Sequence, residues 1–166
     1  MESTVGDWYS MVGDDREAEK WLVRSLDSNP ANVRAHVFLG DLYTRHGQYE
    51  RAALAYRAAV DLMPDWREYR LRLVDALVRS GRASEAAPEA KLLIEREPGD
   101  ARLWSVYAIV LLGAGRVEEA RAAFRMARVD APDNLLYALM LNYADVPRGF
   151  DRALGEVWRS LIGPDS

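Results

Sequence analysis

The sequence predicts an all-α protein built as a solenoid of antiparallel helix pairs. Three residue types recur along the chain with one shared period of 34 residues and a fixed mutual phase. They are Gly13, Gly47, Gly81, Gly115 and Gly149; Ala18, Ala52, Ala86 and Ala120; and Pro30, Pro64, Pro98 and Pro132. A fixed period of this length indicates stacked supersecondary units, each of which buries its apolar face against its neighbours.

Each recurring residue has a structural reason. Proline follows an apolar helical run and opens a loop, because it cannot continue a helix. Asx residues follow it where a helix N-cap is needed, namely Asn32, Asp65, Asp100 and Asn134. A first helix of about 13 residues then runs to the glycine, which suits the left-handed residue at a helix C-terminus. A second helix carries the alanine, at a place where two helices must approach closely.

The segment from Val33 to Trp66 resembles the tetratricopeptide repeat nearly position by position. Its matching residues are Leu39, Gly40, Tyr43, Gly47, Tyr49, Ala52, Tyr56, Ala59 and Pro64. His36 stands where the family prefers Trp. The chain is therefore identified as a member of the tetratricopeptide family. This resemblance implies a right-handed superhelical solenoid of antiparallel helix pairs.

The whole chain, residues 1–166, is predicted to form a single domain. Its repeats are a partial one at about 1–32, full ones at 33–66, 67–100 and 101–134, and a degenerate repeat or C-terminal cap at 135–166, with helices at about 135–144 and 150–161. Val74 replaces the small residue of the pattern, and Pro88 lies inside an expected second helix. With Ser84 as the N-cap, Pro88 predicts a late start or a kink rather than a break in the array.

Composition and motifs give no support for catalysis or nucleic-acid binding. The formal net charge is −4, and there is no cysteine, which excludes disulfides and thiolate chemistry. The two histidines, His36 and His46, lack the spacing of a metal or catalytic pair. The segment Gly113–Gly115 is interpreted as a helix end, because no strand precedes it as in a phosphate loop. We expect no catalytic residue, no metal site and no cofactor.

No segment of the sequence predicts a membrane span or a signal peptide. The longest apolar run, Tyr107 to Ala114, is far shorter than the ~20 residues that cross a bilayer. The first residues have no apolar core flanked by positive charge. We expect a bacterial cytoplasmic protein, with the periplasm as the alternative if a signal or an anchor precedes these residues.

The resemblance also implies where a partner binds. In this family first helices line a concave groove, and five places of each repeat face it. The corresponding residues are Arg34, Val37, Asp41, Thr44, Arg45, Glu68, Leu71, Asp75, Val78, Arg79, Arg102, Ser105, Ile109, Leu112, Gly113, Leu136, Leu139, Tyr143 and Val146. The later members are mostly apolar, so the C-terminal half of the groove is the predicted grip.

These features predict a protein–protein interaction scaffold or adaptor that binds a peptide or protein segment in the groove. The alternatives are a chaperone for a secreted or membrane-targeted client, and the non-catalytic repeat domain of a larger enzyme or assembly factor, such as a glycosyltransferase or a cytochrome c maturation factor. Self-association into a homo-oligomer through exposed apolar surfaces is a further alternative. Trp8, Trp21 and Trp66 fall outside the signature core positions, where they serve either as contacts to a partner or in ordinary packing.

Overall fold

The structure is a computed structural model that describes Gly6, Tyr9 and residues 13–130. Across these residues all the regular elements are α-helices, which confirms the predicted all-α class. They are α2 (Asp15–Ser28), α3 (Val33–Arg45), α4 (Tyr49–Leu62), α5 (Arg67–Arg79), α6 (Ala83–Arg96), α7 (Ala101–Gly113) and α8 (Val117–Asp130). The predicted C-terminal cap and its two helices lie outside the described residues.

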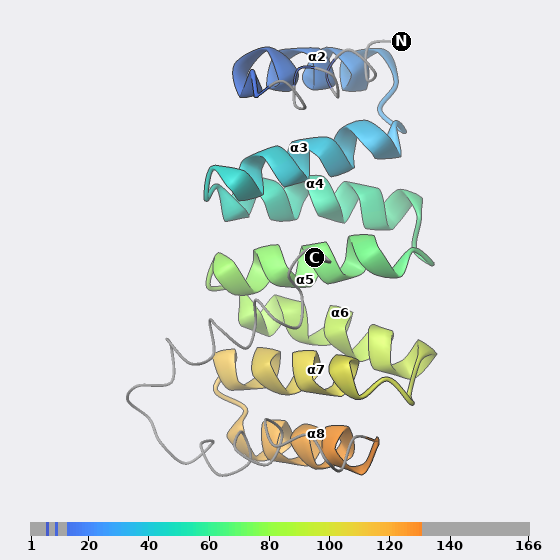
Figure 1. Ribbon diagram of the computed structural model, residues 1–166, viewed down its shortest axis with the longest axis vertical. Helices are drawn as coiled ribbons and strands as arrows, with labels where there is room; N and C mark the ends of the chain where they lie inside the picture. The colour runs from blue at the N-terminus through green and yellow to red at the C-terminus, as the bar shows by residue number, and fades with distance from the viewer. Residues whose placement is uncertain (1–5, 7–8, 10–12, 131–166) are drawn as a thin grey trace. The chain divides into compact units, whose positions relative to one another are not determined.

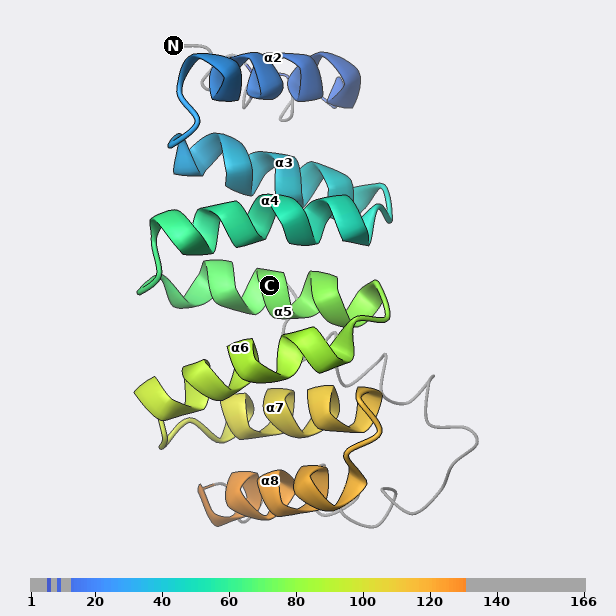
Figure 2. The same cartoon turned by 180° about the vertical axis from the view of Figure 1, so that it is seen from behind.

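The chain divides into two compact units, Met1–Ser80 and Gly81–Ser166. In the first unit α2 packs against α3, α3 against α4, and α4 against α5 (Figure 1). In the second unit α6 packs against α7 and α7 against α8, as the opposite view also shows (Figure 2). Within each unit short turns join consecutive helices, so neighbouring helices run antiparallel.

The recurring glycines have the predicted conformation. Among the described residues, positive φ angles occur at Gly13, Gly47, Gly81 and Gly115, with values from 68° to 82°. An L-residue with a Cβ atom is disfavoured in this left-handed region, which explains why glycine recurs there. Gly113 ends α7 and Ala114 caps it, so the glycine pair is a helix end, as predicted.

Two of the predicted helix caps are confirmed and one is wrong. Asn32 caps α3 and Asp100 caps α7, each side chain accepting a hydrogen bond from a backbone amide of the first turn. The N-cap of α5 is Trp66, which makes no side-chain cap bond. The prediction of Asp65 as a cap fails because this helix begins one residue later than the Asx spacing indicates.

Pro88 leaves α6 unbroken, as predicted, but the expected late start is not seen. The helix begins at Ala83, before Ser84, and continues to Arg96. Proline removes one hydrogen-bond donor from the helix interior. The neighbouring Ala86 and Ala87 are 0% and 2% exposed, and their packing offsets this loss.

Small residues let the paired helices approach closely. The recurring Ala18, Ala52, Ala86 and Ala120 are all 0% exposed. In the first unit Gly40 of α3 lies against the ring of Tyr56 on α4, and a Cβ atom at Gly40 would come within 2.4 Å of Tyr56 Cε1. The backbone of α3 therefore passes directly over this ring.

The family's Trp position holds three different residues that make the same hydrogen bond. Each side chain donates to a proline carbonyl six residues earlier: His36 Nε2 to Pro30, Arg70 Nη2 to Pro64, and Trp104 Nε1 to Pro98, all at 2.9 Å. A carbonyl oxygen only accepts, so Nε2 of His36 carries a proton. His36 is therefore a structural residue that joins a helix to the turn before it.

This shared bond predicts how His36 can be replaced. His36→Phe removes the donor and is expected to lower the free energy of unfolding by about 0.5–1.5 kcal/mol. His36→Trp restores the donor found at Trp104 and should retain the wild-type stability. Urea unfolding of the three proteins measures the difference. Equal midpoints for the Phe and Trp variants would show that the bond to Pro30 contributes nothing.

Candidate protein-binding surface

Asp41 on α3 joins α4 and α5 within the first unit. The hydroxyl of Tyr56 on α4 donates to Asp41 Oδ1 at 2.7 Å, and Arg72 on α5 forms an ion pair with the same carboxylate. Thr44, one turn further along α3, has its hydroxyl 3.3 Å from that of Tyr56. Two predicted groove residues, Asp41 and Thr44, thus lie in a polar network where α3 meets α5.

The protonation state of Tyr56 follows from its surroundings. Burial raises the pKa of Tyr56 well above its usual range, and the negative charge of Asp41 raises it further. A neutral phenol can donate, whereas a phenolate could not donate to a carboxylate. The network is therefore fixed in one direction, with Tyr56 and Arg72 as donors to Asp41.

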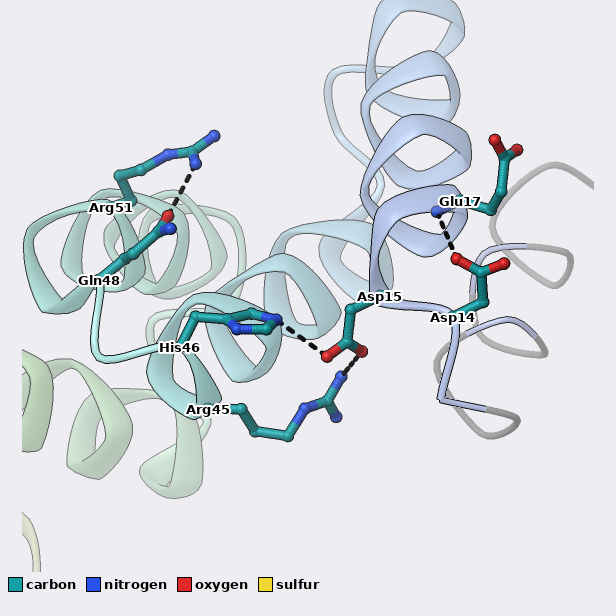
Figure 3. Close-up of polar contacts among 7 residues, drawn as sticks. All are labelled: Asp14, Asp15, Glu17, Arg45, His46, Gln48 and Arg51. Atoms are coloured by element: carbon teal, nitrogen blue, oxygen red, sulfur yellow. Dashed lines mark hydrogen bonds and ion pairs between the residues drawn. The ribbon is translucent and has the colours of Figure 1, made fainter.

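Arg45 and Arg79 occupy the same place in successive repeats. Each contacts the first residue of the second helix of the preceding repeat. Arg45 Nη2 lies 2.5 Å from Asp15 Oδ1, and His46 Nε2 lies 2.9 Å from the other oxygen, as Figure 3 shows. One repeat later Arg79 approaches the Tyr49 hydroxyl at 3.5 Å and donates to Asp75 at 2.8 Å. Arg45 and Arg79 therefore serve to connect helices.

The N-terminal end of α2 is fixed by a separate contact in the same region. Asp14 accepts a hydrogen bond from the backbone amide of Glu17 at 3.2 Å, while Asp15 faces α3 (Figure 3). Asp14 thus satisfies an amide that has no partner within the helix. The two adjacent carboxylates have different structural roles and do not form a catalytic pair.

A cluster that the sequence did not reveal lies between α2, α3 and α4. The Arg51 guanidinium lies 3.9 Å from the ring centroid of Tyr43 and donates to Glu19 at 2.6 Å. The Tyr43 hydroxyl donates to Glu19 at 3.0 Å. Burial, followed by the hydrogen bond and the charge of Glu19, raises the pKa of Tyr43 to about 12. These residues come from different repeats, so no local motif could predict their contact.

The predicted groove residues differ in accessibility. The exposed ones are Arg34, Arg45, Glu68, Arg79, Arg102 and Gly113, and the half-buried ones are Val37, Asp41, Thr44, Leu71, Val78 and Leu112. Asp75, Ser105 and Ile109 are 9%, 1% and 4% exposed, and Ser105 donates its hydroxyl proton to the Ala101 carbonyl. Ser105 and Ile109 therefore offer no contact surface.

The structure leaves fewer of the predicted residues in the apolar C-terminal half of the groove available for contact with a partner. Its members Leu136, Leu139, Tyr143 and Val146 lie outside the described residues, and Ile109 is buried. Among the described residues Leu112 is what remains of it. The first unit instead presents three half-buried apolar residues on α3 and α5, namely Val37, Leu71 and Val78. We call these three residues the first-helix row.

The family model for the cytochrome c-type biogenesis protein H TPR domain matches residues 20–145 of this chain. The chain belongs to the tetratricopeptide repeat (TPR) family. This confirms the resemblance seen in the sequence, and the chain is a TPR scaffold of the kind that supports interaction between proteins. Related folds are likewise TPR scaffolds.

Solved structures share the TPR fold. MamA from Desulfovibrio magneticus RS-1 has a TM-score of 0.71 and 17% identity, with 97% of this chain and 91% of that chain covered. MamA AMB-1 is 28% identical with a TM-score of 0.66, and 76% and 75% are covered. YrrB, described as a TPR protein with an unusual peptide-binding site, has a TM-score of 0.72 and 15% identity, with 96% and 84% covered.

Two curated relatives match this chain over a small part of their own length. Protein O-mannosyl-transferase TMTC1 of Homo sapiens is 33% identical over 96 residues, which is 57% of this chain and 11% of that protein. The Vi polysaccharide export protein VexE of Salmonella typhi is 31% identical over 130 residues, which is 75% of this chain and 20% of that protein. The chain thus spans between about a tenth and a fifth of their lengths.

Two features are absent from the part of the TPR chain that the structure describes. Between residues 13 and 130, no group of three or more acidic or histidine side chains is placed to hold a metal ion. None of the helices α2 to α8 combines the length and the apolar character that crossing a membrane requires.

The raised pKa of Tyr43 predicts an alkaline effect on stability. Since the folded pKa of about 12 lies above the ordinary value of 10.0, the stabilisation from Tyr43 is complete below about pH 10 and is lost as the pH rises towards 12. Thermal unfolding across this range should show the stability advantage of wild type over Tyr43→Phe becoming smaller. A constant difference between the two proteins would contradict the assignment.

Proposed function

We propose that this chain is a protein-interaction scaffold that holds a segment of another polypeptide on the first-helix row. The observation that carries the proposal is the partial exposure of Val37, Leu71 and Val78, of which Val37 lies one helical turn from Asp41 and Leu71 next to Arg72, the two residues of an ion pair. These residues lie at places that the repeat assigns to the partner, while other residues fill the core. Membership of the TPR family supports the same role.

The charges around the row suggest how a segment would be recognised. The Asp41 carboxylate already has Arg72 and Tyr56 as donors, so a partner would gain little by competing for it. Apolar side chains of the partner would therefore supply most of the affinity by covering the row. Arg34 and Glu68 are exposed beside it, and such rim charges mainly affect the association rate and orientation.

The proposal includes no catalytic step, in line with the non-catalytic character of TPR scaffolds. A nucleic-acid partner is disfavoured by the net charge of −4, since phosphate contacts need a basic surface. A cytoplasmic location is part of the proposal, and a periplasmic one is its alternative. The partner we propose is a protein or peptide.

The scaffold proposal can be tested with peptides that are selected from a displayed random library because they bind the whole chain. Val37→Glu with Leu71→Glu places charge in the row, and we expect the selected peptides to lose about tenfold or more in affinity. Leu54→Glu is the matched control, because Leu54 is 67% exposed on the second helix α4. Unchanged affinity in a folded double variant, measured by titration calorimetry and circular dichroism, would exclude the row.

A second candidate is the repeat domain of an assembly factor in cytochrome c-type biogenesis. The family model favours it, and the small share of each curated relative that the chain covers is compatible with a repeat domain of a larger protein. In this function the held segment would belong to a client of that pathway. The chain would bind this segment with the same surface residues, but its partners would be restricted to proteins of that pathway.

This candidate predicts a cellular phenotype. Deleting the gene should lower the amount of haem-stained c-type cytochrome severalfold, and the wild-type gene should restore it. The Leu54→Glu variant should also restore it, whereas the row double variant should not. Normal cytochrome levels in the deletion strain would rule out this function and leave the general scaffold proposal intact.

A further inference from the structure

The turn that joins α4 to α5 (Figure 1) carries apolar residues where the turns one repeat earlier and one repeat later carry polar ones. Leu62, Met63 and Trp66 are 38%, 41% and 49% exposed. The residues one repeat earlier are Ser28, Asn29 and Asn32, and those one repeat later are Arg96, Glu97 and Asp100. Since polar residues make the same turn elsewhere, folding does not require the apolar ones.

The turn holds its aromatic residue in a defined position. The Trp66 amide donates to the Met63 carbonyl at 3.1 Å, and the Arg70 guanidinium donates to the Pro64 carbonyl at 2.9 Å. The Trp66 ring stacks on Tyr69, with 5.8 Å between ring centroids and 27° between planes. A fixed, exposed Trp can bind a partner with little further loss of conformational entropy.

Acidic residues surround the exposed apolar side chains. Asp61, Asp65 and Glu68 are all exposed, and the basic residue among them, Arg67, is half-buried. Surface potentials at protein interfaces are complementary, so this surface favours a partner that brings positive charge. It disfavours nucleic acids and anionic lipid surfaces for the same reason.

We propose that Leu62, Met63, Trp66 and Tyr69, which we call the turn patch, dock a segment of another protein that interleaves apolar residues with Lys or Arg. The apolar anchors cover Trp66 and Met63, and the basic residues face the exposed carboxylates of Asp61 and Glu68. Exposed Trp is among the residue types that dominate binding energy at interfaces. The turn patch and the first-helix row have no residue in common, although Glu68 lies beside both, and the patch does not depend on the function of the row.

Another exposed apolar residue of the first unit lies outside the turn patch. Leu54 is 67% exposed but stands alone among Glu50, Arg51 and Arg57 on α4. Single apolar residues on a surface are normal and need no partner. Leu54 therefore gives a matched control within the same unit.

The test variant replaces two residues of the turn patch by the residues that the preceding turn carries at the same places. Met63→Asn with Trp66→Asn copies Asn29 and Asn32 of the preceding turn. Asn at position 66 also offers a side-chain cap, which Trp66 does not make in α5. The double variant is expected to fold, and its circular dichroism and thermal midpoint verify this.

The probe is a synthetic array of peptides of about 15 residues, long enough for about four helical turns. Each contains two or three aliphatic or aromatic residues interleaved with Arg or Lys, and a matched set carries Glu in place of the basic residues. Binding of the whole chain is measured for wild type, the patch double variant, Leu54→Gln, and Asp61→Asn with Glu68→Gln. The strongest peptides are then titrated by fluorescence anisotropy.

We expect basic peptides to bind wild type and Leu54→Gln equally, and to bind the patch double variant about tenfold or more weakly. The Asp61→Asn, Glu68→Gln protein should bind them severalfold more weakly, with a smaller salt dependence. Val37→Gln with Leu71→Gln, which removes apolar side chains of the first-helix row without adding charge, should leave this binding unchanged and so separates the turn patch from the row.

Several results would overturn the proposal. One is an array in which every basic peptide binds the patch double variant as tightly as it binds wild type. Another is that the Glu-containing peptides bind wild type as tightly as the basic peptides do. A third is concentration-dependent self-association of wild type, seen by light scattering and abolished in the patch double variant. That result would make a second copy of this chain the occupant in place of a basic segment.

Discussion

The close approach of paired helices is the constraint on which the rest of this structure depends. Each pair buries its apolar face because a residue without a large side chain stands where the two backbones come nearest. The recurring alanines meet this demand with complete burial, and Gly40 meets it against the ring of Tyr56. A larger residue at Gly40 would displace Tyr56 from Asp41, so the packing of two helices and the polar network beside them depend on the same residue.

The turn geometry follows from the same constraint. Two helices can return along each other only if the chain reverses within a few residues, which the left-handed glycines allow. At the opposite ends a proline carbonyl would lack a partner, and His36, Arg70 and Trp104 each supply one. Side chains of unlike chemistry are interchangeable there because the fold requires only an N–H donor at one point in space.

The features that could be predicted from the sequence are those repeated by the period. Periodic Gly, Ala and Pro predict the helices, their ends and the close contacts between them. Predictions made from a single local signal were less reliable: Asp65 is not a cap, and Ser84 does not begin α6. Both helices begin where the 34-residue period places them, α5 at Arg67 and α6 at Ala83, so the period outweighs the preference of one side chain.

The candidate site could be predicted less well, because it depends on contacts between repeats. The pairs Asp41–Arg72 and Arg45–Asp15 join residues about one repeat apart, and no spacing rule selects those partners from the many arginines of this chain. Burial of Ile109 was also missed, since a family position indicates a direction on the helix but not what covers it. Residues that obey the period serve the fold that many proteins share, so recognition of a particular partner must reside in residues that depart from it. We propose that Val37, Leu71 and Trp66 serve this recognition, because Val37 and Leu71 are half-buried and Trp66 is 49% exposed, which leaves apolar surface for a partner to cover.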